Sequence, residues 1–255
     1  MENGSLVGLS RQIALQRELD VVANNIANIN TTGFKADNVV FQEHLMPHAR
    51  ANQFRGPDRA VSLVQDRATW LDLSQGPVEQ TGNPLDIAIS GNGYLAVQTP
   101  RGERYTRNGA LQVNGVGELV TTEGLRVVGQ NGPIVLQPGD RDISISTDGT
   151  ISVREGQNTT DTARGKLKLV SFPNPQQLEK DGTSTYRGPN GVQPQPADNV
   201  RVTQGVIEKS NVKSVTEMTR MIEVTRAYTE IASMLQSQSD MRRNAVDKLA
   251  EVPTS

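Results

Sequence analysis

Residues 20–35, DVVANNIANINTTGFK, decide the fold that we predict, because an amphipathic helix there runs into a turn that contains glycine. Apolar side chains spaced three and four apart lie on one side of a helix. One such stripe enters this stretch from upstream: Leu15, Leu19, Val22, Ile26 and Ile29. Another falls on nearly the opposite side: Leu6, Leu9 and Ile13. A helix with two apolar stripes must contact neighbours on both sides.

We expect this first helix to span residues 6–29, with Ser5 as its N-cap. Its asparagines are poor helix formers, so packing has to supply the stability that propensity does not. We expect the helix to stop at residues 30–33, NTTG. Short polar side chains there compete for backbone hydrogen bonds, and Gly33 takes a positive φ freely.

A second helix is predicted at the other end of the chain. Ser214 and Glu217 match a capping box directly before an apolar-periodic run. Apart from Gln238 and Arg242, that run is a coiled-coil seam: Met221, Val224, Tyr228, Ile231, Leu235, Gln238, Arg242, Ala245 and Leu249. Charged residues are interleaved with the seam, so we do not expect the helix to insert into a membrane.

Between the helices the hydrophobic period changes to two, which predicts β-strands from about Thr81 onward. Turn signals such as Asn108-Gly109 and Asn114-Gly115 follow at short intervals. This spacing favours hairpins in a small sandwich or barrel-like domain.

The predicted fold class is therefore α+β, with terminal helices paired as an α-helical coiled coil and a central all-β domain of short hairpin strands. The predicted segments are the N-terminal helix of the coiled-coil core (1–35), an extended connector (36–80), the central β domain (81–204) and the C-terminal helix of the core (205–255).

Charge and composition exclude several functions. A net charge of -2, without a basic stripe, gives no electrostatic basis for binding nucleic acid. The absence of cysteine excludes disulfides and cysteine nucleophiles. No run approaches ~18 apolar residues, so we do not expect the chain to span a membrane. The opening MENGSLVGLS has neither a basic leader nor an apolar run, so we expect no cleaved signal peptide.

No pattern predicts catalysis, a metal or a cofactor. His44 and His48 are spaced like helical metal ligands, but Pro47 lies between them and no further ligand is evident. The glycine pairs at Gly91-Asn92-Gly93 and Gly115-Val116-Gly117 complete no phosphate-binding motif and fit hairpin turns. Carboxylates are scattered, so no acid–base pair can be placed. We expect a protein that is not an enzyme.

The two ends carry more apolar surface than one chain covers by pairing its helices. The far stripe of the N-terminal helix remains, as do four residues that flank the C-terminal seam: Met218, Ile222, Met234 and Met241. Other subunits are the natural cover, and we expect such chains to stack side by side into a tube. The alternative is a self-contained helical hairpin that caps the β domain.

Residues 20–35 closely resemble the N-terminal signature of the bacterial flagellar rod and hook family. Residues 205–228, GVIEKSNVKSVTEMTRMIEVTRAY, resemble its C-terminal signature. Residues 83–129, NPLDIAISGNGYLAVQTPRGERYTRNGALQVNGVGELVTTEGLRVVG, look like the β domain shared by the rod proteins. One departure is Thr225, where the family usually has Gln, and it concerns a helix–helix hydrogen bond.

Within that family, LSRQ at residues 9–12 and RRNA at residues 242–245 look most like the proximal rod members that adjoin the distal rod. The distal rod paralogue is the alternative. The resemblance implies a structural subunit of the drive shaft that transmits motor torque to the hook, located in the periplasmic rod of the basal body. It also implies three kinds of partner: proximal and distal rod subunits, copies of this chain, and the flagellar type III export apparatus.

The expected assembly interface lies on the two terminal segments. It comprises Leu15, Leu19, Val22, Asn25, Ile26, Ile29, Gly33, Phe34, Met218, Met221, Ile222, Val224, Arg226, Tyr228, Ile231 and Leu235. Two other classes of protein remain as alternatives, a secreted hydrolase of cell-wall glycan, which would need two facing carboxylates, and a monomeric adhesin.

Overall fold

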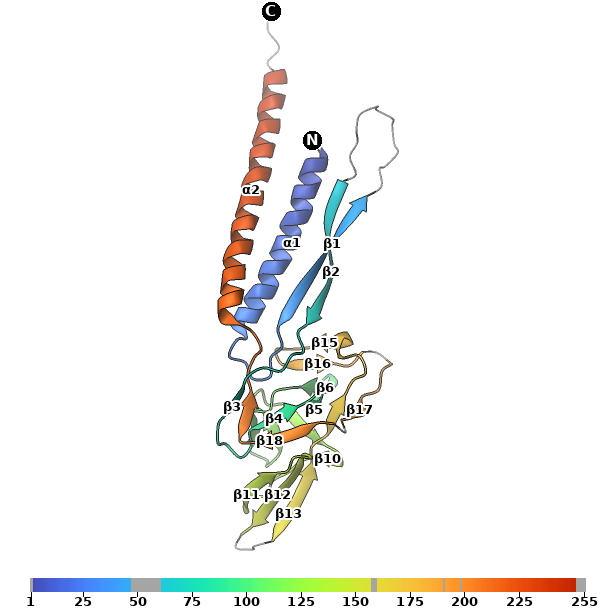
Figure 1. Cartoon of the computed structure of the whole chain (residues 1–255), viewed down its shortest axis with the longest axis vertical. Coiled ribbons are helices and arrows are strands. Elements are labelled where there is room, and N and C mark those ends of the chain that lie inside the picture. Colours follow the sequence, from blue (N-terminus) through green and yellow to red (C-terminus); the bar gives the residue numbers. More distant parts are fainter. Residues whose placement is uncertain (1, 47–60, 157–159, 190, 198, 251–255) are drawn as a thin grey trace, which may run out of the picture. The chain divides into compact units, whose positions relative to one another are not determined.

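The computed structural model describes residues 2–46, 61–156, 160–189, 191–197 and 199–250 (Figure 1). The fold is α+β, with a helix at each end of the chain and a β-rich centre. The chain divides into two compact units. Unit 1 comprises Met1–Ile26, Asp37–Trp70 and Lys213–Ser255, and unit 2 comprises Ala27–Ala36 and Leu71–Val212.

Two helices lie side by side in unit 1 (Figure 1). Helix α1 spans Glu2–Ala27 and helix α2 spans Ser214–Ala250. Helix α2 begins at the predicted residue, whereas α1 begins earlier than residue 6 and ends two residues before Ile29. The early end has a local cause. Asn28 accepts hydrogen bonds from the backbone and the hydroxyl of Thr31, and this turn replaces further helical bonds.

The region predicted as an extended connector contains a pair of long strands. Strand β1, Asp37–Met46, pairs with β2, Val61–Leu71, in a two-stranded sheet (Figure 1). This pairing was not predicted, because β1 carries no regular alternation and 14 residues, 47–60, separate it from its partner.

Unit 2 is built from short strands. Its first strands are β3 (Val78–Gln80), β4 (Ile87–Ser90), β5 (Tyr94–Thr99), β6 (Gly102–Thr106), β7 (Leu111–Val113), β8 (Leu119–Thr121), β9 (Arg126–Gly129) and β10 (Gly132–Pro133). The next are β11 (Asp140–Ile145), β12 (Thr150–Glu155), β13 (Asp161–Lys166) and β14 (Leu169–Ser171). After the short 3-10 helix η1 (Pro175–Gln177) come β15 (Glu179–Lys180), β16 (Thr185–Arg187), β17 (Gln195–Pro196), β18 (Arg201–Gln204) and β19 (Val206–Glu208).

The largest sheet has the order β15-β16-β6-β5-β9-β8-β7, with β14 joining β5 and β17 and with β10 joining β9. A three-stranded sheet, β11-β12-β13, pairs its neighbouring strands in antiparallel fashion. Strands β18 and β19, which precede α2 in the sequence, pair back onto β4 and β3. The returning chain is thus integrated into unit 2.

The core of unit 2 has an aliphatic and an aromatic part. Aliphatic side chains from β4, β5 and β9 pack with those of the β11-β12-β13 sheet, and Ile89, Leu95 and Val153 are fully buried. The aromatic part groups Tyr94 with Phe172, whose ring centroids lie 6.1 Å apart in an edge-on arrangement. The chain has only four tyrosines and four phenylalanines in 255 residues, but several of them gather in this part of the core and pack against one another.

Of the Asn-Gly pairs at residues 108–109 and 114–115, both predicted as turns, one forms a hairpin turn and the other has a different role. Asn114-Gly115 does connect β7 to β8, where the side chain of Asn114 accepts the N–H of Val116 and that of Glu118. Asn108-Gly109 instead lies against β4: the Gly109 carbonyl accepts the Ile87 N–H at 2.9 Å, and a Cβ on Gly109 would meet the Ile87 carbonyl oxygen at 1.9 Å. Glycine is needed at position 109 for close approach, not for a turn.

We expect Gly109→Ala to lower the free energy of unfolding of unit 2 by about 2 kcal/mol, because the methyl group must displace the backbone of β4. The matched control is Gly115→Ala, whose Cβ meets nothing within 4 Å, and we expect it to change stability by less than about 0.5 kcal/mol. Urea denaturation followed by circular dichroism measures both. Equal effects of the two variants would contradict the close approach.

Burial, with Glu103 nearby, raises the pKa of Tyr105 to about 12, and burial also raises the pKa of Tyr94. Both groups hold their protons more tightly folded than unfolded, so the associated stability is fully present below the unfolded pKa of about 10 and is lost as pH rises through the folded values. We expect a spectrophotometric titration to show late-ionising tyrosines, and Tyr105→Phe to remove one of them. An unchanged late phase in that variant would contradict this assignment.

Candidate functional site: the helix pair and a buried ion cluster

Side-chain contacts show that α1 and α2 run in opposite directions. From one end of the pair to the other, the Asn25 amide donates to Glu217 at 3.3 Å, Arg220 pairs with Glu18 at 2.8 Å and the Gln12 amide donates to the Tyr228 hydroxyl at 3.2 Å. At the far end, Leu235 lies against Gly8, where a Cβ would meet its Cδ2 at 2.8 Å. Along the pair, the residue numbers of the contacting side chains therefore rise on α2 as they fall on α1, as in an antiparallel pair.

Helix α2 extends beyond its partner. It has 37 residues against the 26 of α1, and Leu235 already lies opposite Gly8. The side chains of residues 241–248 are all exposed. The predicted seam positions Arg242 and Ala245 are exposed in these last turns of α2, which continues past the start of α1; the side chain of Leu249 lies outside the described residues.

The two predicted stripes of α1 differ in burial. On the first, Val22 is fully buried, and Leu15, Leu19, Ile26 and Ile29 are partly buried. On the second, Leu6, Leu9 and Ile13 are 55%, 49% and 63% exposed. Leu9 and Ile13 line a cavity of about 340 Å³ that also includes Tyr228 of α2. The second stripe is thus an uncovered apolar surface on the described chain.

Helix α2 shows the same division. Val224 is buried, while Tyr228, Ile231 and Leu235 are partly buried. The remaining members of the expected interface, Met218, Met221, Ile222 and Arg226, are exposed, as are Met234 and Met241.

Asn25 is fully buried and makes its contacts within unit 1. Its side chain both accepts the Asp37 N–H at 3.0 Å and donates to the Asp37 carbonyl at 2.9 Å, and it also donates to Glu217. The carboxamide thus pairs with the main chain as a neighbouring strand would, and it joins α1, β1 and α2.

Gly33 and Phe34, also expected at the interface, lie buried in unit 2. Gly33 has a φ of 69°, and a Cβ there would meet the Arg107 backbone at 2.4 Å. The Lys180 ammonium lies 4.0 Å from the centre of the Phe34 ring. The positive φ of Gly33 was predicted from its place in the turn, but the close contact with the Arg107 backbone was not.

A buried ion cluster follows directly after Phe34. It comprises Lys35, Arg107 and Glu208, whose side chains are 1%, 4% and 1% exposed. Glu208 Oε1 accepts from Lys35 Nζ at 2.5 Å and from the Gly76 N–H at 3.0 Å, and its Oε2 accepts from Arg107 Nη1 at 3.3 Å. Burial lowers the pKa of Lys35 below its ordinary value, while Glu208 opposes the shift.

Asn211 connects the same part of unit 2. Its Oδ1 accepts the Ala36 N–H at 2.8 Å, and its Nδ2 donates to the carbonyls of Asp72 at 2.8 Å and Ser74 at 3.2 Å. No role was predicted for Lys35, Arg107, Glu208 or Asn211. Glu208 directly follows the apolar pair Val206-Ile207, but the other three have mixed neighbours, and a single sequence does not show that any of them is buried.

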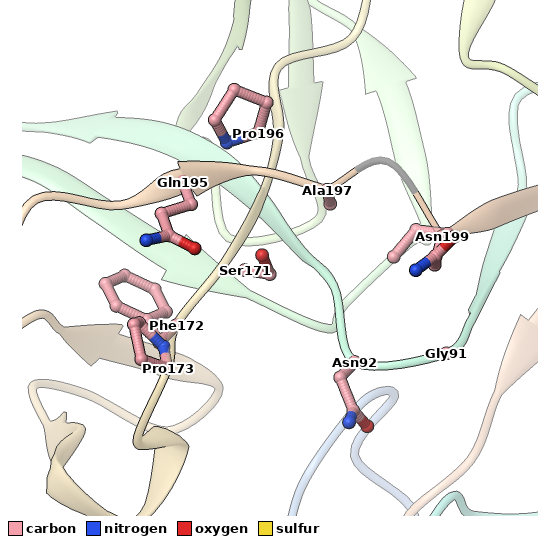
Figure 2. A pocket seen from close by; sticks show the side chains of 10 residues that line it. Gly91, Asn92, Ser171, Phe172, Pro173, Gln195, Pro196, Ala197 and Asn199 are labelled. Atoms are coloured by element: carbon pink, nitrogen blue, oxygen red, sulfur yellow. The ribbon is translucent and has the colours of Figure 1, made fainter.

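A pocket of about 580 Å³ opens elsewhere in unit 2, between the turn after β4 and the chain around β14 and β17. Figure 2 shows Gln195, Phe172 and Pro173 at one side of it and Asn92 and Asn199 at the other. The described residues that line it carry no ionisable side chain. These described lining residues therefore offer hydrogen-bonding amides but no general acid or base.

Within the described residues, no three or more His, Cys, Asp or Glu residues group as metal ligands would. The side chains of His44 and His48 lie outside the described residues. In the described part of the chain, neither helix combines the length and apolar character needed to cross a membrane.

A helix pair with uncovered apolar stripes, attached to a β-rich unit, places the chain in the class of helix-flanked structural subunits. Comparison with known families identifies which one. Residues 6–35 match the flagella basal body rod protein model, residues 88–153 match the flagellar hook protein FlgE/F/G D1 domain, and residues 203–248 match the flagellar basal body rod FlgEFG protein C-terminal model.

Similar proteins cover the full chain. The flagellar basal-body rod protein FlgF of Caulobacter vibrioides is 38% identical over 253 residues, which are 99% of this chain and 100% of that protein. FlgF of Mesorhizobium japonicum is 34% identical over 98% of both chains, and the rod protein FlgG of Bacillus subtilis is 30% identical over 94% of this chain and 96% of that protein.

The chain belongs to the flagellar basal-body rod protein family, and it is a structural rod subunit of the basal body, not an enzyme. This confirms the predicted resemblance and overturns the alternatives of a cell-wall hydrolase and an adhesin.

We expect Asn25→Ala to destabilise unit 1 by about 2 kcal/mol, because it leaves Glu217 and the main chain of Asp37 without buried hydrogen-bond partners. The control is Gln16→Ala on the same helix, which removes one exposed hydrogen bond to Asp20. Thermal melting of the helical circular dichroism signal compares them. A loss no greater than that of the control would show that the buried carboxamide is dispensable.

Proposed function

We propose that α1 and α2 pair as a coiled coil and that their exposed stripes bind the helices of neighbouring rod subunits, including copies of this chain. The observation that carries this proposal is the uncovered apolar surface on both helices, from Leu6 to Ile13 on α1 and at Met218 and Ile222 on α2. The buried members of the expected interface, Val22, Asn25 and Val224, position the helices from inside.

Magnitudes favour association through this surface. Full burial of a large apolar side chain contributes about 1.5–3 kcal/mol, so covering five or six of them contributes about 10 kcal/mol. The loss of translational and rotational freedom costs about 4–15 kcal/mol per association. One such contact is therefore marginal, and several contacts to several neighbours in a tube make the assembly stable.

Within the family, we propose that this subunit belongs to the proximal rod in the periplasm, that it transmits motor torque towards the hook, and that the flagellar export apparatus delivers it. Full-length similarity to FlgF proteins supports the proximal position. The FlgG proteins, at 30% identity or more over most of the chain, support the distal rod as the second candidate. Electron microscopy of basal bodies with a tagged chain distinguishes the two positions.

We expect Ile222→Asp or Ile13→Asp to abolish assembly without unfolding the subunit, because each side chain is already exposed in the single chain and a carboxylate there would be buried unpaired on contact with a neighbour. The control is Ser237→Asp, at another exposed position of α2. Sedimentation measures self-association, and motility measures assembly in the cell. Wild-type motility in both Asp variants would sink the proposed interface.

A further inference from the structure

Three segments that are far apart in the sequence meet at the ion cluster inside unit 2. They are residues 33–36, 72–76 and 208–211. Main-chain hydrogen bonds link them in turn: the Gly33 N–H donates to the Glu208 carbonyl at 2.8 Å, and the Asp72 N–H donates to the Ala36 carbonyl at 2.8 Å. Residues 33–36 and 72–76 are irregular, whereas Glu208 is the last residue of β19 and residues 209–211 are irregular again, so most of each segment lies outside secondary structure.

The charges of the cluster do not balance. Lys35 and Arg107 are both cations and share one buried anion, Glu208. Arg107 is held independently of the other two residues, because its guanidinium also donates to the carbonyls of Ile89, at 3.1 Å, and of Gly91. Lys35 has one further partner, the Ser74 carbonyl at 2.6 Å. Glu208 is therefore the carboxylate that contacts both buried cations, while the Asp72 carboxylate acts on Lys35 through its charge.

Burying an uncompensated charge is far more costly than leaving it in water. Partial closure of the three segments would bury Lys35 or Arg107 without the anion, or Glu208 without Lys35 and the Gly76 N–H. All such partial states are penalised, whereas the fully closed state satisfies the carboxylate at both oxygens.

We infer that Glu208 is the hub of a conformational lock, in which residues 33–36, 72–76 and 208–211 close together or not at all. This property goes beyond the proposed role in assembly, because it belongs to a single chain. Closure fixes at one time the residues that precede β1, follow β2 and precede α2. The ends of β1, β2 and α2 that adjoin these segments therefore become ordered together when the lock closes.

Because one anion in the cluster faces two cations, removing the anion and then removing one cation are expected to have opposite effects on the same segments. Glu208→Gln removes the carboxylate that both buried cations contact, so amide hydrogen exchange at Gly33, Asp72 and Asn211 is expected to accelerate together by at least about tenfold, whereas Ala96 and Leu119 in the sheet keep their rates. Adding Lys35→Met to Glu208→Gln removes one of the uncompensated cations, and exchange is expected to slow again. Lys35→Met would then restore the protection from hydrogen exchange that Glu208→Gln removed.

The matched control is Glu79→Gln. Glu79 lies on β3, paired with β19 next to Glu208, but its carboxylate is 56% exposed and pairs with Lys209 at the surface; exchange is expected to remain at wild-type rates. Acceleration confined to Gly76, or no recovery in the double variant, overturns the lock. If Glu208→Gln alone fails to fold, thermal unfolding of the double variant decides: recovered folding supports the lock, and continued failure overturns it.

Discussion

The buried carboxylate of Glu208 needs cations beside it, and this requirement constrains the part of unit 2 that adjoins β1, β2 and α2 in the sequence. Glu208 compensates Lys35 and Arg107 at once, and all three are shielded from water. Buried ion pairs of this kind contribute little net stability, since desolvation offsets their attraction. Separating the partners is nevertheless costly, because it leaves a buried charge unpaired. Their value here is in specifying a single arrangement of segments that are largely irregular.

The helices of unit 1 are specified in a different way. Their inner faces meet through a few polar contacts, among them Gln12 with Tyr228 and Glu18 with Arg220, and through partly buried apolar residues. Their outer faces keep apolar side chains in water. For an ordinary monomer this would be a liability, whereas for a rod subunit it agrees with the structural role that the family shares.

Local features of the fold were predictable because their signals are local. The 3.6-residue period placed both helices and separated the two stripes of α1, and Asn114-Gly115 marked a true hairpin. Features that depend on distant partners were not predictable. Lys35 and Glu208 are 173 residues apart, and Asn25 and Glu217 are 192 apart. In a single sequence, nothing distinguishes a buried lysine from a solvated one, or the close approach at Gly109 from a turn.

Unequal helix lengths have a geometric consequence for any polymer of this chain. In the antiparallel pair, α2 runs past the start of α1 and forms an overhang whose side chains at residues 241–248 are exposed. If neighbouring subunits cover this overhang, as proposed for the exposed stripes, it stays uncovered at one tip of the polymer only. The two tips of such a polymer then differ chemically, and this polarity follows from the single subunit.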